Sequence, residues 1–185
     1  MPSEPTSDQL PTVIAIDGPA GSGKSTVGKR LASELGLEYL DTGAMYRGVT
    51  FAALRRNIDP ADADDVAQLA VNVELVLGPG TIHVDGVDAT IEIRGPEVTR
   101  AVSLVAANPA VRTEMVRRQR AWADERGGGV LEGRDIGSVV FPDAVLKVYL
   151  TAAPEVRAQR RSKEVTDLSY ETVAADLARR DALDQ

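Results

Sequence analysis

The chain has 185 residues, of which 43% are hydrophobic and 26% charged, so we expect one globular domain rather than a disordered chain. A total of 21 Lys and Arg against 28 Asp and Glu gives a net charge of −7, which argues against broad binding to nucleic acid or to an anionic membrane. The absence of Cys and the single His exclude disulfides, thiolate chemistry and a His-rich metal site. Residues 1–11 lack the basic start and apolar stretch of a signal peptide, and no apolar run is long enough to span a bilayer. We therefore expect a disordered tail over 1–11 and a cytoplasmic protein.

The first predicted elements are a strand, a glycine-rich loop and a helix. The β-branched run at 12–17 is typical of a buried strand, and apolar spacing over 26–35 predicts a helix that Gly36 ends. A short strand over 38–40 and a helix over 44–56 follow. Thr42 stands just before this second helix, and we predict that it is the N-cap.

The middle of the chain changes character. Over 73–93, short alternating runs are broken by Gly78-Pro79-Gly80 and by Asp85-Gly86, and Asp-Gly between apolar runs is a strong hairpin signal. This pattern predicts a small antiparallel insertion. Helices over 96–105 and 109–125 follow, the second with Pro in its first turn.

The last part again alternates strands with helices. We predict a strand over 130–132, a buried strand over 145–150, and helices over 154–163 and 170–183, with Ser169 as the N-cap of the last helix. Because strands and helices alternate, the predicted fold class is α/β with a parallel sheet flanked by helices.

Residues 18–26 read GPAGSGKST and match the P-loop pattern. Its glycines let backbone N–H groups form a cradle for phosphate oxygens, and the helix that begins there adds its positive dipole end. Lys24 can reach the β- and γ-phosphates, and the Ser25 hydroxyl can bind Mg²⁺. The motif follows a predicted strand and opens a predicted helix, so we predict that a nucleoside triphosphate binds to Gly18, Pro19, Ala20, Gly21, Ser22, Gly23, Lys24, Ser25 and Thr26.

The helix predicted over 154–163 carries three arginines on one face, at i, i+3 and i+4: Arg157, Arg160 and Arg161. Like charges so placed repel one another, which favours an anionic group opposite them. Arg179 and Arg180 add two more charges after a short loop, although Glu155 and Glu164 could neutralise part of the cluster. We interpret the segment as a mobile lid whose arginines stabilise charge on a transferring phosphoryl group.

Two further charged groups fall near the predicted phosphate site. Arg47 lies about one turn into the second helix and could bind a second phosphate. The loop Glu132-Gly133-Arg134-Asp135 follows a predicted parallel strand, and ligands of open α/β sheets bind outside the carboxyl ends of the strands.

The segments GPAGSGKST, LDTGAMYR, 111–120, EGRDIGSVVFPDA, RAQRR and ARRDALD, in this order, resemble the bacterial cytidylate kinases, which are P-loop nucleoside monophosphate kinases. The resemblance covers 13–184, and the LDTGAMYR and EGRDIG segments make it far more specific than the P-loop alone. It implies a P-loop NTPase core within a kinase domain over 12–185. It also implies an NMP-binding insertion near 64–108 and a helical lid near 154–180.

The resemblance also implies roles for single residues. ATP would lie on 18–26, and Thr42, Arg47 and Arg134 match positions near the acceptor phosphate. Ser103, Arg112 and Asp135 match positions that read the cytosine edge, and two more match positions near the acceptor nucleotide, Arg180 and Asp184. The implied catalytic set is Lys24, Arg134, Arg157 and Arg161.

The implied reaction transfers the γ-phosphoryl group of ATP to CMP or dCMP, with Mg²⁺ bound through Ser25, in pyrimidine nucleotide metabolism. The acceptor oxygen is already anionic at neutral pH, so positioning and charge stabilisation are sufficient and no strong base is required. The expected partners are ATP and CMP or dCMP, without nucleic acid or membrane, and the expected enzyme is a monomer. Two alternatives remain: a P-loop kinase for another small acceptor, and a non-catalytic nucleotide-binding module.

The sequence departs from the family at its end. In the family, an Arg and then a last strand and helix follow the position of Asp184, and none of these is present in the sequence given. We therefore expect the chain to be truncated at its C-terminus, and to be less stable and less active than a version extended by these elements.

Overall fold

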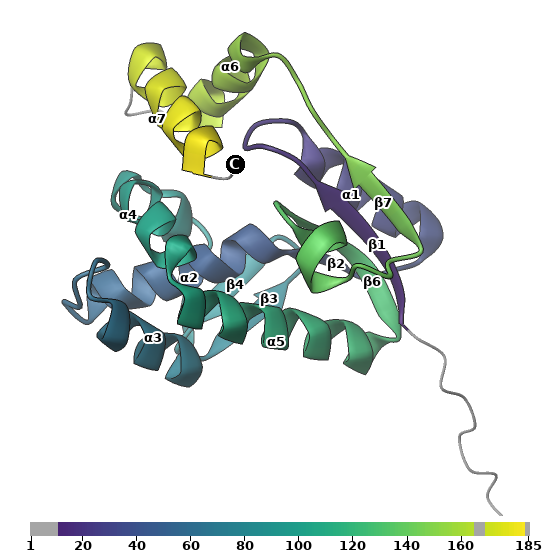
Figure 1. Ribbon diagram of the computed structural model, residues 1–185, viewed down its shortest axis with the longest axis horizontal. Helices are drawn as coiled ribbons and strands as arrows, with labels where there is room; N and C mark the ends of the chain where they lie inside the picture. Colours follow the sequence, from purple (N-terminus) through teal and green to yellow (C-terminus); the bar gives the residue numbers. More distant parts are fainter. Residues whose placement is uncertain (1–10, 165–168, 184–185) are drawn as a thin grey trace, which may run out of the picture.

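The structure is a computed structural model that describes residues 11–164 and 169–183, apart from the side chains of Glu164, Arg180 and Leu183 (Figure 1). The tail predicted over 1–11 lies, except for Pro11, outside the described residues, and so does Asp184. Among the described residues, no helix combines the length and the apolar character that crossing a bilayer requires.

A parallel sheet of four strands, in the order β2-β6-β1-β7, forms the centre of the protein. Its strands are β1 (Thr12–Asp17), β2 (Tyr39–Asp41), β6 (Gly128–Gly133) and β7 (Leu146–Tyr149). This confirms the predicted α/β fold. Because all four strands are parallel, their carboxyl ends meet at one edge of the sheet, where the P-loop also begins.

Helices cover both faces of β1, which is why its four middle residues are all apolar. Ile14 and Ile16 pack towards one helix, while Val13 and Ala15 belong to the main core on the opposite face. This period of two follows from strand geometry, in which successive side chains point to opposite faces. The helices concerned are α1 (Lys24–Leu35) on the first face, and α2 (Thr42–Arg55) and α5 (Pro109–Arg126) on the second.

An insertion between α2 and α5 carries the predicted antiparallel sheet. Its elements are α3 (Ala63–Asn72), β3 (Leu75–Gly78), β4 (Thr81–Val84), β5 (Val87–Asp88), the 3₁₀ helix η1 (Glu92–Arg94) and α4 (Pro96–Ala107). Asp85 and Gly86 connect β4 to β5 with φ values of 50° and 75°. Positive φ at both positions is what a two-residue hairpin turn requires, so the Asp-Gly prediction is confirmed.

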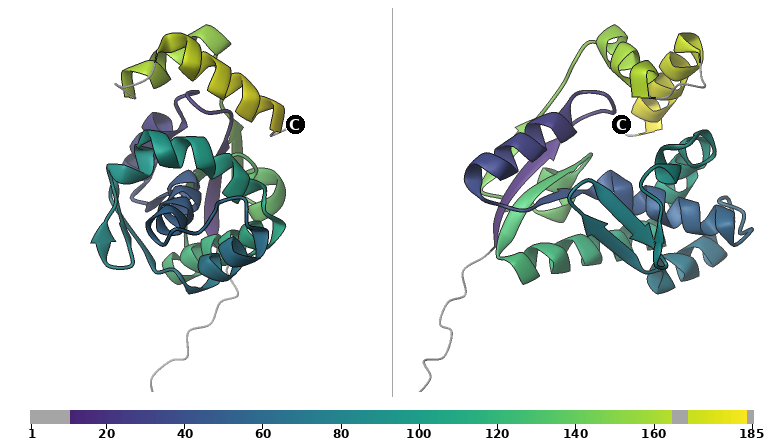
Figure 2. Two further views of the ribbon diagram at one scale, coloured as in Figure 1. Left: turned by 90° about the vertical axis from the view of Figure 1, so that its left-hand side faces the viewer. Right: turned by 180° about the vertical axis from the view of Figure 1, so that it is seen from behind.

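Two helices, α6 (Pro154–Glu164) and α7 (Tyr170–Leu183), form a separate pair. They pack against each other through Ala158, Val173 and Leu177, and Ala20 of the P-loop contacts the same small cluster. Ser169 is the N-cap of α7 as predicted, because its hydroxyl accepts the Thr172 N–H at 3.3 Å. Figure 1 and Figure 2 both show this helix pair over the P-loop. The segment that follows β7 joins the pair to the sheet.

The sequence-based prediction lacks three helical elements, namely α3, η1 and η2. α3 has a readable signal, since Val66, Leu69 and Ala70 follow helical spacing and are buried. The π-helix η2 (Ile136–Val140) has no such signal. The carboxylate of Asp17 holds its start by accepting the N–H groups of Ile136 and Gly137 at 2.7 and 2.8 Å, a contact between distant parts of the chain.

The prediction that 145–150 forms a buried strand is wrong about burial. Within the described residues β7 has β1 as its only neighbour, so it is an edge strand. Leu146 is 46% exposed and Tyr149 is 71% exposed. A continuous apolar run therefore does not guarantee that both faces of a strand are covered.

The predicted N-cap of α2 is also wrong by one residue. Asp41 caps the helix, since its carboxylate accepts the Ala44 N–H at 3.0 Å. The Thr42 hydroxyl instead donates to the backbone carbonyl of Glu132 at 2.6 Å. Adjacent Asp and Thr are both good caps, and the distant Glu132 carbonyl decides between them.

Candidate active site

The P-loop connects β1 to α1 and depends on glycine at its tightest points. Gly18 and Gly21 have φ values of 150° and 75°, which disfavour other residues. A Cβ on Gly18 would lie 2.0 Å from the Leu150 carbonyl oxygen, and one on Gly21 would lie 2.9 Å from that of Arg157. The loop therefore follows a path that only glycine permits, as a cradle of backbone N–H groups requires.

Lys24 begins α1 and folds back over the loop. Its ammonium group donates to the carbonyl oxygens of Gly18 at 2.7 Å and Pro19 at 2.9 Å. Burial lowers the pKa of Lys24 to about 8, while the nearby Glu132 acts in the opposite direction. The loop carbonyls thus hold a half-buried cation next to the space that the P-loop encloses.

Ser25 is joined to Glu132 at the end of β6. The Ser25 hydroxyl donates to Glu132 Oε1 at 2.7 Å, whereas Oε2 is buried and has no partner among the described residues. Burial, with a further contribution from Asp41, raises the pKa of Glu132. The sequence indicated the charged loop 132–135 but gave Glu132 no role. Its position at the carboxyl end of the strand beside β1 is the signal that could have identified it.

A large cleft lies at the carboxyl edge of the sheet, between the P-loop, α2, α4, α5 and α6. Its lining includes P-loop residues 20–26 and these further residues that the sequence singled out: Thr42, Arg47, Ser103, Arg112, Glu132, Arg134, Asp135, Arg160 and Arg161. Tyr46 and Gln119, to which the sequence analysis gave no role, are also part of the lining. Segments far apart in the chain thus meet around one space.

The side of this cleft away from the P-loop is held by α2, α4 and α5. Arg112 on α5 forms an ion pair with Asp135, which follows β6. Arg47 on α2 donates to the carbonyl of Ile93 at 3.0 Å and to the Thr99 hydroxyl at 3.1 Å, so its guanidinium ties α2 to the insertion. Cations and a carboxylate are therefore fixed in place before any ligand binds.

The three arginines of α6 do not share one environment. Arg157 is only 7% exposed, pairs with Asp181 of α7 at 2.7 Å, and does not line the cleft. Arg160 lines the cleft and donates to the Ser22 carbonyl at 3.0 Å, and Arg161 lines it as well. The spacing therefore predicted that the three side chains lie on one helix. It did not predict that Arg157 is buried in an ion pair while Arg160 and Arg161 line the cleft. The side chain of Arg180 lies outside the described part of the chain, as Asp184 does.

Arg134, which follows β6, lies near charged residues of this helix pair. Burial lowers the pKa of Arg134, Asp181 raises it, and Arg157 lowers it. Arg134 and Arg157 thus both lie near Asp181, which links the loop after β6 to α6 and α7.

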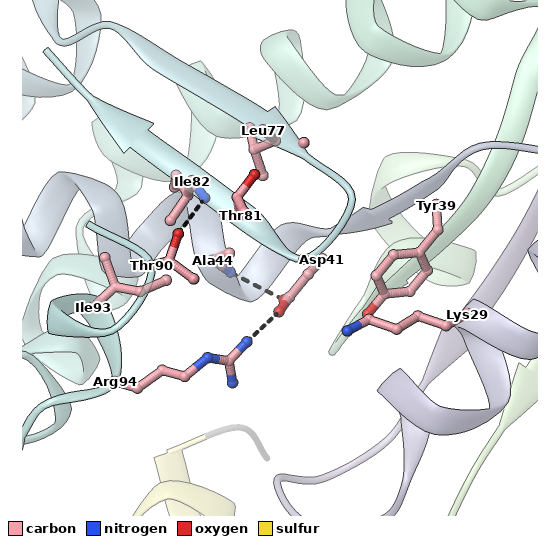
Figure 3. Close-up of a pocket in the computed structure, with 12 residues that line it drawn as sticks. Lys29, Tyr39, Asp41, Ala44, Leu77, Thr81, Ile82, Thr90, Ile93 and Arg94 are labelled. Atoms are coloured by element: carbon pink, nitrogen blue, oxygen red, sulfur yellow. Dashed lines mark hydrogen bonds and ion pairs between the residues drawn. The ribbon is translucent and has the colours of Figure 1, made fainter. Parts of the chain in front are cut away.

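A smaller pocket separates the core from the antiparallel sheet (Figure 3). Arg94 points across it towards Asp41, with 3.7 Å between guanidinium nitrogen and carboxylate oxygen. On the other side, the Lys29 ammonium lies 5.8 Å from the centre of the Tyr39 ring. Asp41 therefore caps α2 and contacts the insertion at the same time.

A family model described as cytidylate kinase matches residues 14–185. A cytidylate kinase of Mycobacterium leprae (strain Br4923) is 52% identical over 176 residues, which cover 93% of this chain and 79% of that protein. One from Roseiflexus castenholzii is 48% identical, covering 95% of this chain and 81% of that protein. A bifunctional pantoate ligase/cytidylate kinase of Synechococcus sp. (strain JA-2-3B'a(2-13)) is 50% identical, covering 97% of this chain and 35% of that longer protein.

Proposed function

The chain belongs to the cytidylate kinase family, and we propose that it transfers the γ-phosphoryl group of ATP to CMP or dCMP, giving ADP and CDP or dCDP. The observation that carries this proposal is the single cleft that joins the P-loop to the Arg112–Asp135 pair. One end offers a phosphate cradle, and the other offers a fixed donor and acceptor for a base. A phosphoryl transfer between two nucleotides needs the phosphate cradle and the base-binding groups in the same cleft.

The donor is proposed to bind on residues 18–26. Phosphate oxygens would replace the carbonyl oxygens of Gly18 and Pro19 as partners of Lys24. In this exchange neutral acceptors are replaced by anionic ones, which form stronger hydrogen bonds with the ammonium group. The exchange would also place the cation where negative charge develops during transfer.

The residues at Ser25 fit Mg²⁺, the ion that ATP-dependent phosphoryl transfer generally uses. Mg²⁺ prefers oxygen ligands and is usually bound through one or two carboxylates and the phosphates. Ser25 would hold the ion, and Glu132, with its unpartnered Oε2, lies beside it. When bound, the ion would neutralise charge on the β- and γ-phosphates.

The acceptor is proposed to bind at the opposite side of the cleft, with the β3–β5 sheet, η1 and α4 as its NMP-binding insertion. Its phosphate would contact Thr42, Arg47 and Arg134. Its base would be read by Ser103, Arg112 and Asp135, with Asp135 accepting from the cytosine amino group. Uracil carries a carbonyl at that position and would face the carboxylate without a donor, so it would be rejected.

The helices α6 and α7 are proposed to act as the lid. Arg161, on the cleft side, would stabilise charge on the transferring group, and closure would exclude water. Arg157 would act chiefly by holding α6 on α7, because Asp181 already neutralises it. Arg180 and Asp184 are proposed to contact the acceptor nucleotide.

The experiment is to measure ADP release with ATP and each of CMP, dCMP, UMP, AMP and shikimate. CMP and dCMP should be the preferred acceptors. Preference for shikimate would instead assign a different small-molecule kinase. Tight ATP binding without transfer to any acceptor would assign a nucleotide-binding module. Either result would overturn the proposal.

A further inference from the structure

Gln119 is a polar residue in an apolar part of α5. The helix buries one stripe against the core, and the members four residues before and after Gln119 are Met115 and Ala123. Both are fully buried, and Gln119 itself is 1% exposed. A Leu or Met would pack at this position without any polar atom, so the amide needs a physical explanation.

The amide oxygen of Gln119 has no hydrogen-bond partner among the described residues. A buried acceptor that lacks a donor costs free energy, about 1–3 kcal/mol. Gln119 is also one of the residues that line the large cleft, so it belongs to the wall of the space in which a ligand would sit. A donor on that ligand would remove the cost.

The surroundings of Gln119 place it beside the pair proposed to read the base. It lies two helical turns after Arg112 on the same face of α5. Burial raises the pKa of the Tyr46 hydroxyl. Asp135 also raises this pKa, whereas Arg112 and the Gln119 amide lower it. Tyr46 is therefore the common neighbour of all three groups, and all four residues line the cleft.

We propose that the Gln119 side-chain oxygen accepts a hydrogen bond from the exocyclic amino group of the acceptor's base, which makes Gln119 a specificity-determining residue. This inference rests on the proposed function. A cytosine amino group has two N–H donors, so it can serve Asp135 with one and Gln119 with the other. Uracil has no donor at this position and would leave the Gln119 oxygen unpaired.

The test compares Gln119→Met with the wild-type chain. Met is unbranched and close to Gln in size, so packing is kept while the acceptor is removed. The KM for CMP should rise about three- to tenfold, the worth of one neutral hydrogen bond, with little change in kcat. The KM for UMP should stay the same or fall. The melting temperature without nucleotide should stay the same or rise. Gln68→Met, at an exposed position outside the cleft, is the matched control and should change none of these values.

A second probe isolates the amino group. The pyrimidin-2-one analogue of CMP lacks that group, so it should bind the wild-type chain more weakly than CMP does. In Gln119→Met, the difference between CMP and the analogue should shrink about threefold or more, as measured by calorimetry.

The outcomes separate the two proposals. If the wild-type chain phosphorylates CMP but Gln119→Met keeps the same KM and the same preference over the analogue, this inference is wrong and the proposed function stands. Equal losses for CMP and UMP together with a lower melting temperature would assign Gln119 a structural role and also overturn it. If the wild-type chain does not phosphorylate CMP, the proposed function fails, and this inference fails with it.

Discussion

The ammonium group of Lys24 donates hydrogen bonds to two loop carbonyls, and Lys24 itself lines the cleft. Lys24→Ala should therefore lower turnover of CMP by about 10²- to 10³-fold, the range measured when one such charge-stabilising donor is removed. The melting temperature should change little, because Lys24 belongs to none of the apolar core clusters. Initial rates and thermal melting check this. More than about a tenth of the wild-type turnover would contradict the role given to Lys24.

A substitution at Asp135 tests whether this residue reads the base of the acceptor. Asp135→Asn should reduce the ratio of kcat/KM for CMP to that for UMP, because an amide can donate to uracil as well as accept from cytosine. The change also weakens the ion pair with Arg112, so some loss with both acceptors is expected. If the ratio stays within about twofold, Asp135 does not read the base.

Single residues also show where sequence reasoning reaches its limit. The P-loop spacing predicted Lys24 and Ser25 because the phosphate cradle is one contiguous segment. Tyr46 and Gln119 gave no such signal, since an aromatic residue and an amide at helical spacing look like ordinary parts of a helix. Only the packing of α2 against α5 brings them to the cleft.

The helix α6 carries one arginine that lines the cleft and one that is paired with α7, so we expect their Ala variants to have different effects. Arg161 lines the cleft, so Arg161→Ala should lower kcat much more than it weakens ATP binding. Steady-state kinetics together with binding of an ATP analogue measure this split. A raised KM with unchanged kcat would make Arg161 a ground-state binder instead.

Arg157 belongs to the packing of the helix pair. Arg157→Ala removes one partner of a largely buried ion pair and leaves Asp181 behind, which typically costs about 3 kcal/mol or more. Amide hydrogen exchange should accelerate across α6 and α7 and stay unchanged in α3, which serves as the internal control. Unchanged exchange in α6 would show that the Asp181 contact does not hold the pair together.

At the scale of elements, strands and helices with a local pattern were predictable and their environments were not. The central strand β1 and the Pro-initiated helix α5 follow directly from apolar runs and start signals. The exposure of β7 depends on which strands flank it, and η2 depends on the distant carboxylate of Asp17. Neither feature leaves a mark in the local sequence.

At the scale of the whole molecule, the cleft is built by the core, the insertion and the α6–α7 pair together. CMP alone should slow hydrogen exchange in α4, and an ATP analogue alone should slow it in the P-loop and α6. With both ligands present, protection should extend across all three parts, since binding stabilises the state that binds. Protection by CMP confined to α6 would contradict the proposed division of the cleft.

The strand order has a consequence for how the protein is made. A ribosome releases β1 early, yet both of its neighbours, β6 and β7, lie in the last third of the chain. Until they emerge, the backbone N–H and C=O groups along both edges of β1 have no strand to pair with, and such a state is prone to aggregation. The insertion packs on itself, on α2 and on α5, all of which precede β6 in the chain, so it can fold during that wait. The nucleotide site therefore assembles after the insertion, because Glu132, Arg134 and Asp135 arrive only with β6 and Arg161 arrives later still with α6.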